Sequence, residues 1–126
     1  MARIMVCDDD RELTRKLLNA LRAAGHEAET CRHTMDVLRE ASGGRFDLVA
    51  FGLELPGFGR NGAIEAMREV APHVALIAIH ESPAAVLREM ARARVAAVLP
   101  RPVVVKDFIE AVGHALRQQE LPALHA

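Results

Sequence analysis

The chain has 126 residues, of which 51% are hydrophobic and only 3% aromatic, so one domain with an aliphatic core is expected. Basic and acidic residues nearly balance, 16 against 17, which excludes the basic surface typical of nucleic-acid binding. No apolar run approaches the ~20 residues of a membrane-spanning helix, and no secretory signal is visible. We therefore expect a cytoplasmic domain that binds neither nucleic acid nor membrane.

The cysteines and histidines show neither the number nor the spacing of a disulfide framework or a metal site. Cys7 and Cys31 are too few for a disulfide framework, and we expect two packed thiols. The six histidines lack the spacing of metal ligands. They are His26, His33, His73, His80, His114 and His125.

Short apolar runs alternate with longer amphipathic ones. They predict strands at 3–7, 27–31, 47–52, 74–79 and 95–99. The second strand is the most polar and belongs at a sheet edge. Helices are predicted at 11–24, at 35–41, between an Asn61 cap and Pro72, from a Ser82-Pro83 start to about Arg94, and from 106 to about 119.

Five strand–helix repeats predict an α/β fold with a parallel sheet and right-handed crossovers. We expect a flavodoxin-like, doubly wound sheet of five strands in the order 2-1-3-4-5, with five helices. Residues 1–120 form the domain, and 121–126 form a disordered tail. In such folds any site lies at the carboxyl ends of the strands.

Acidic residues follow the first predicted strand, at Asp8, Asp9 and Asp10. Carboxylates at this place are ligands that Mg²⁺ prefers. The spacing of Asp9 and Glu12 is also that of a capping box, and carboxylates there suit the helix dipole. Both interpretations are open at this point.

Four motifs in order resemble those of the response-regulator receiver (CheY-like) domain, from about Arg3 to Gln119. They are residues 4–10, 46–52, 53–57 and 98–102. The resemblance implies an acidic pair at Asp8 and Asp9. It also implies a phosphoacceptor position at Gly52 and, before a cis proline, a lysine position at Arg101.

The departures from the family pattern fall on its chemistry. Gly52 has no side chain to phosphorylate, and Arg101 replaces a point charge with a planar fork. The switch hydroxyl falls on Ile79 or His80, and the switch aromatic on Val98. The resemblance therefore implies a pseudo-receiver with no catalytic residues.

We expect Arg101 to reach across the space above Gly52 and bond Asp8, Asp9 or both, because a strand glycine often permits close approach. The alternative is an open, hydrated pocket. Mg²⁺ binding by Asp8 and Asp9 should be weak or absent, and no cofactor is expected. Glu54 is either a third carboxylate of the pocket or a solvated loop residue.

The residues Val103, Val104 and Val105 cannot all face the core. In receivers the fourth helix, fifth strand and fifth helix form the usual partner face, so this run is either a contact surface or packing under a loop.

Three functions are compatible with the sequence. The first is a phosphorylation-independent interaction module in two-component-type signalling, which binds another signalling protein or forms a homodimer. The second is a sensor holding a small anionic metabolite in the emptied pocket. The third, a phosphatase using Asp8 and Asp10, lacks the further lysine and distal acidic residues that such enzymes need.

Overall fold

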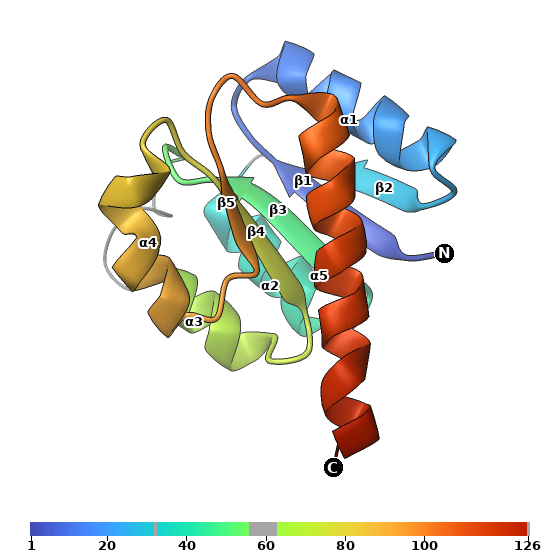
Figure 1. The fold of residues 1–126 in the computed structure, drawn as a ribbon, viewed down its shortest axis with the longest axis vertical. Coiled ribbons are helices and arrows are strands. Elements are labelled where there is room, and N and C mark those ends of the chain that lie inside the picture. The colour runs from blue at the N-terminus through green and yellow to red at the C-terminus, as the bar shows by residue number, and fades with distance from the viewer. Residues whose placement is uncertain (32, 56–62, 126) are drawn as a thin grey trace.

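The computed structural model describes residues 1–31, 33–55 and 63–125. Over these residues five strands alternate with five helices, as predicted (Figure 1). The strands are β1 (Arg3–Cys7), β2 (Glu27–Thr30), β3 (Leu48–Gly52), β4 (Ala75–Ile79) and β5 (Ala97–Leu99). The helices are α1 (Arg11–Ala23), α2 (Thr34–Ser42), α3 (Ala63–Val70), α4 (Pro83–Arg92) and α5 (Val105–His125).

The strands form one parallel sheet in the order β2-β1-β3-β4-β5, which confirms the predicted topology. Strands β3 and β4 are buried along their whole length, because parallel strands inside such a sheet are covered on both faces. Strand β2 is exposed at three of its four residues and lies at the edge, as predicted.

Helices α1 and α5 cover one face of the sheet, and α2, α3 and α4 cover the other (Figure 1). The alternation of side chains along β1 divides its residues between the two faces. Ile4 and Val6 belong to the same core cluster as Phe108 of α5. Met5 belongs to the opposite cluster, with Met67 of α3. The sheet therefore separates two aliphatic cores.

Helix α1 begins at Arg11 as predicted, but its N-cap lies one residue later than the expected Asp9. Asp10 is the N-cap, and its side chain accepts a hydrogen bond from the backbone N–H of Leu13 at 3.1 Å. The capping box predicted at Asp9 and Glu12 is wrong, because the helix begins at Arg11 and the capping position is the residue directly before it. Asp9 is exposed.

Helix α5 is longer than predicted. Its backbone is helical through His125, beyond the expected end near Gln119, and the disorder expected for 121–126 stays a prediction. Proline disfavours a helical conformation at the residue before it, which here is Leu121. Proline removes one intrahelical donor, and here the helix continues past it. Within the described residues, no helix has both the length and the apolar composition for crossing a membrane.

Two other predicted helix starts have different outcomes. Asn61 and residues 56–60 before it lie outside the described residues. Ser82 is the N-cap of α4, with Pro83 in the first turn, but its hydroxyl makes no capping hydrogen bond. The backbone N–H of Ser82 instead donates to Nδ1 of His80 at 2.9 Å.

Arg68, in the last turn of α3, binds the turns at the opposite end of the sheet from the predicted site. Its guanidinium donates hydrogen bonds to carbonyl oxygens on two segments, those after α3 and after α4. The acceptors are Ala71, Pro72, Val74, Ala93 and Arg94. Arg68 thus connects the α3–β4 turn to the α4–β5 turn.

Candidate functional site

The predicted site residues lie at the carboxyl edge of the sheet, at the ends of three strands. Asp8 directly follows β1, Gly52 is the last residue of β3, and Arg101 lies two residues after β5. Because parallel strands end at the same edge, the fold brings together residues that are far apart in sequence.

Arg101 is the centre of the site. Its Nη2 donates a hydrogen bond to Oδ2 of Asp8 at 2.5 Å. The same nitrogen donates to Oε2 of Glu54 at 3.1 Å, while Nε donates to Oε1 of Glu54 at 3.2 Å. The guanidinium therefore forms a two-bond fork with Glu54 and a third bond with Asp8. The peptide bond between Arg101 and Pro102 is cis, as the family resemblance implies.

The Asp8 carboxylate is the most deeply buried group of the three. Its side chain is 0% exposed, against 23% for Arg101 and 37% for Glu54. The second oxygen of Asp8, Oδ1, accepts the backbone N–H of Asp10 at 2.9 Å. Both Asp8 oxygens therefore have partners within the protein, as a buried carboxylate requires.

The ion pairs shift the pKa values of Arg101 and Glu54, which are the two partly exposed residues of the site. Burial by itself lowers the pKa of Arg101, but its hydrogen bonds with Glu54 and Asp8 outweigh burial, and the net shift is upward. Burial by itself raises the pKa of Glu54, but the hydrogen bond from Arg101, a backbone hydrogen bond and the charges of Arg101 and His80 together outweigh burial, and the net shift is downward. Both shifts favour the charged forms.

Gly52 leaves the space that the guanidinium needs. A Cβ added there would lie 2.7 Å from Nη2 of Arg101 and 3.1 Å from Cγ of Asp8, and it would overlap Oδ2 of Asp8. Any side chain at this position would therefore require Arg101 or Asp8 to move. The absence of a side chain and the contact between Arg101 and Asp8 thus depend on each other.

The positions expected to carry the switch have no hydroxyl group. Ile79 is fully buried and is the register partner of Gly52. His80 is half-buried, and its Nδ1 is occupied by the N–H of Ser82. Val98 is half-buried and packs on the core beneath α2, α3 and α4.

The residues at this edge do not fit a magnesium site. Oδ2 of Asp8 is bonded to Arg101, the Glu54 carboxylate is bonded to the same guanidinium, and Gly52 supplies no ligand. Asp9 is exposed, outside this cluster of contacts. Over the described residues, no group of three or more His, Cys, Asp or Glu side chains could hold a metal ion.

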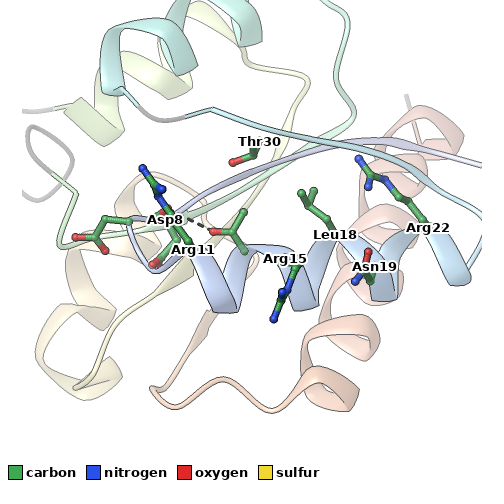
Figure 2. A pocket seen from close by; sticks show the side chains of 9 residues that line it. Asp8, Arg11, Arg15, Leu18, Asn19, Arg22 and Thr30 are labelled. Carbon is green, nitrogen blue, oxygen red and sulfur yellow. Dashed lines mark hydrogen bonds between the residues drawn. The ribbon is translucent and has the colours of Figure 1, made fainter.

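A groove of about 370 Å³ adjoins Asp8 and Asp9 between α1 and β2. Arg11 lies at the end nearest Asp8 and Arg22 at the other end, with Leu18 between them (Figure 2). The groove therefore adds positive charge beside the acidic residues, which further disfavours a divalent cation there.

The valine run is divided between the core and the surface. Val103 and Val105 are half-buried and pack on the core beneath α1 and α5. Val104 is 55% exposed. One of the three valines is therefore available at the surface.

Glu54 is the site residue that the sequence assigned least firmly. The sequence is compatible with a pocket carboxylate or a solvated loop residue, and in the structure Glu54 binds Arg101 in the pocket. Its position two residues after Gly52 was the available signal. That signal was weak, because the direction of a side chain after a strand end depends on the turn: here Leu55 N–H donates to the Gly52 carbonyl.

Similar folds identify the architecture. A response regulator receiver domain protein (CheY-like) from Methanospirillum hungatei JF-1 superposes with a TM-score of 0.85 at 22% identity, covering 97% of this chain and 98% of that one. A receiver domain protein from Clostridium thermocellum gives 0.83 at 21% identity, covering 96% and 98%. The chain thus has the fold of a receiver domain.

Sequence matches point the same way. The chain is 28% identical over 123 residues to the DNA-binding transcriptional regulator NtrC of Azospirillum brasilense, and 29% identical over 111 residues to a response regulator receiver protein of Anaeromyxobacter sp. (strain Fw109-5). It spans 26% and 47% of the lengths of these two proteins. No protein-family model matches. The fold and these matches together support the interpretation of the chain as a response-regulator receiver (CheY-like) domain.

Proposed function

We propose that this receiver domain acts in two-component-type signalling as a phosphorylation-independent protein-interaction module. One observation carries the proposal: the Arg101 guanidinium lies where a side chain at position 52 would be, bonded to Asp8. In this proposal an internal cation replaces both the phosphoacceptor and the metal. The domain then has one stable state at this edge and needs no phosphoryl transfer to reach it.

The proposed contact surface is the face formed by α4, β5 and α5. Leu87 of α4 and Val104 before α5 are each 55% exposed, so both side chains can contact a partner. The partner is another signalling protein or a second copy of this chain, and the proposed location is the cytoplasm. Replacing Val104 by Glu should weaken association, measured by sedimentation velocity of the domain alone and with a captured partner.

Backbone amide NMR spectra test the central claim. Spectra are recorded for the protein alone and then with Mg²⁺ and beryllofluoride, a mimic of the phosphoryl group. We expect no shifts at Asp8, Glu54 or Arg101, because their charged atoms are already paired. Saturable shifts centred on these residues would contradict the proposal.

The variant Gly52→Asp provides a matched control. It restores a carboxylate at the phosphoacceptor position but leaves Ile79, His80 and Val98 unchanged, so no switch is available to respond. We expect no change in its oligomeric state on treatment with a small phosphodonor. A phosphodonor-dependent change in this single variant would refute the view that switching has been lost at several positions.

The small-anion sensor is the less supported alternative. It needs a free cation in the pocket, whereas Arg101 is bonded by both Asp8 and Glu54. An anion would have to displace two carboxylates. Protection of Arg101 from a guanidine-modifying reagent by a metabolite pool, beyond the protection in buffer, would favour the sensor over the interaction module.

A further inference from the structure

The two cysteines of the chain lie opposite each other on β1 and the end of β2. The register pairs Val6 of β1 with Thr30 of β2. Cys7 and Cys31 are the next residues along these two chain segments. The N–H of Cys31 donates to the carbonyl of Val6 at 3.4 Å, which keeps the two strands paired up to this point. Both side chains pack in the same core cluster, so they project from the same face of the sheet.

The strand spacing in this arrangement suits a disulfide. Neighbouring strands lie roughly 4.7–4.9 Å apart, and disulfides join residues whose Cα atoms are about 4.4–6.8 Å apart. Register partners in a sheet project side by side, so the thiols are directed to the same place. Cys31 follows the last residue of β2, which gives its backbone more freedom to adjust than a residue inside the strand has.

The two thiols differ in exposure. Cys7 is completely buried, and burial, together with the nearby Cys31, raises the pKa of its thiol. A protonated, buried thiol reacts slowly with an oxidant in solution, so Cys7 is suited to the second step of an oxidation, in which the sulfur that it attacks is held beside it. Cys31 is half-buried and lines a pocket of about 250 Å³ together with Phe46 and Arg45. A small oxidant would therefore reach Cys31 first.

We propose that Cys7 and Cys31 are an oxidative modification site, at which hydrogen peroxide converts the two thiols into an intramolecular disulfide. The Cys31 sulfur attacks one peroxide oxygen, giving a sulfenic acid and one water. The Cys7 sulfur then attacks the Cys31 sulfur, the S–S bond forms, and the hydroxyl leaves with the Cys7 proton as a second water. The two sulfurs lose two electrons, and the two peroxide oxygens gain them.

The bond would act next to the site described above. Cys7 directly precedes Asp8, and Cys31 begins the connection from β2 to α2. A disulfide would covalently link Cys7, the residue before Asp8, to Cys31 at the start of the β2–α2 connection. This inference stands apart from the proposed interaction function, since it depends only on the two thiols and the register of β1 and β2.

Oxidation of the wild-type protein tests the proposal. The folded protein is treated with hydrogen peroxide, with glutathione in a parallel tube to verify the oxidant. The readouts are intact mass without reductant, thiol titre after denaturation, and peptide mapping. We expect a monomer lighter by two hydrogen atoms, loss of both thiols, a crosslink between the Cys7 and Cys31 peptides, and full recovery with a reductant.

The variant Cys31→Ser is the control, since buried Cys7 should keep its thiol under the same peroxide treatment. Three results would overturn the proposal. They are an oxygenated Cys31 beside an intact Cys7 thiol, a disulfide between two copies of the chain, and a wild-type protein whose thiols both survive conditions that oxidise the glutathione.

Discussion

Replacing Arg101 by Met tests how strongly the site depends on its internal cation. Methionine keeps much of the length and apolar contact of the side chain but removes all five N–H donors. Asp8, whose side chain is 0% exposed, would lose the bond to Oδ2 and keep only the Asp10 N–H on Oδ1. Glu54 would lose both of its bonds to the guanidinium.

The expected loss follows from the burial of each partner. Removing one member of a buried ion pair costs about 3–5 kcal/mol. The site is open enough to leave 23% of the Arg101 side chain exposed, so water can partly hydrate Asp8, and about 2 kcal/mol is a better value for that pair. The exposed Glu54 pair adds about 0.5 kcal/mol. The sum, about 2.5 kcal/mol, corresponds to a fall in Tm of about 9 °C for a chain of this length.

Thermal and urea unfolding followed by circular dichroism would measure the change. Glu54→Gln is the matched control, because it removes the weaker pair only and should cost under about 1 kcal/mol. Added Mg²⁺ should raise the Tm of Arg101→Met more than that of the wild-type protein, since the freed carboxylates can accept a cation. If Arg101→Met unfolds at the wild-type midpoint, the ion pairs do not hold the site together.

Three further predictions concern particular contacts. Gly52→Ala should destabilise the fold by about 1–2 kcal/mol, although replacing a strand glycine usually gains roughly 0.5–1 kcal/mol; in an Arg101→Met background the same change should cost less, because Oδ2 of Asp8 is released from the guanidinium and can move away from the new Cβ, measured as a double-mutant cycle. The lowered pKa of Glu54 means that its contribution to stability is complete above its ordinary value of 4.5 and is lost as the pH falls through the lower folded value. Urea midpoints between pH 7 and 3 should therefore fall less steeply for Glu54→Gln than for the wild-type protein, and parallel slopes would count against the pair. Arg68→Met should lower the free energy of unfolding by about 2–3 kcal/mol, since several carbonyls lose a charged donor. Hydrogen exchange of the backbone amides should become faster in both turns that Arg68 connects. Unchanged exchange in the α4–β5 turn would disprove the connection.

The sheet and the principal contact of the site were predictable from the sequence. Apolar runs separated by amphipathic segments determine five strand–helix units, and few parallel topologies accommodate five such units. Once Asp8 and Arg101 are both placed at the carboxyl edge of the sheet, charge complementarity predicts their contact across the end of β3, where Gly52 lies. The missing side chain at Gly52 indicates where the guanidinium can pass. These inferences depend on residue type, which is read from the sequence, and on strand order, which follows from the alternation of strands and helices.

The details that were missed depend on single backbone turns. Whether Asp9 or Asp10 caps α1 is decided by the residue at which the helix begins, and both residues are good caps. The position of Glu54 depends on the turn after β3. The continuation of α5 past Pro122 depends on the balance between one lost donor and the remaining helical bonds. Differences of a few tenths to about one kcal/mol decide such cases, and propensity alone does not resolve them.

The contact between Arg101 and Asp8 joins residues that are 93 positions apart in the chain. A contact this distant in sequence forms late in folding, after the intervening strands have paired, because its loop-closure entropy must be offset first. During synthesis Asp8 leaves the ribosome long before Arg101 exists, so its carboxylate remains hydrated until β5 is added. We therefore expect the pocket to close only after β5 has joined the sheet, so its protection from solvent exchange would report that all five strands have paired.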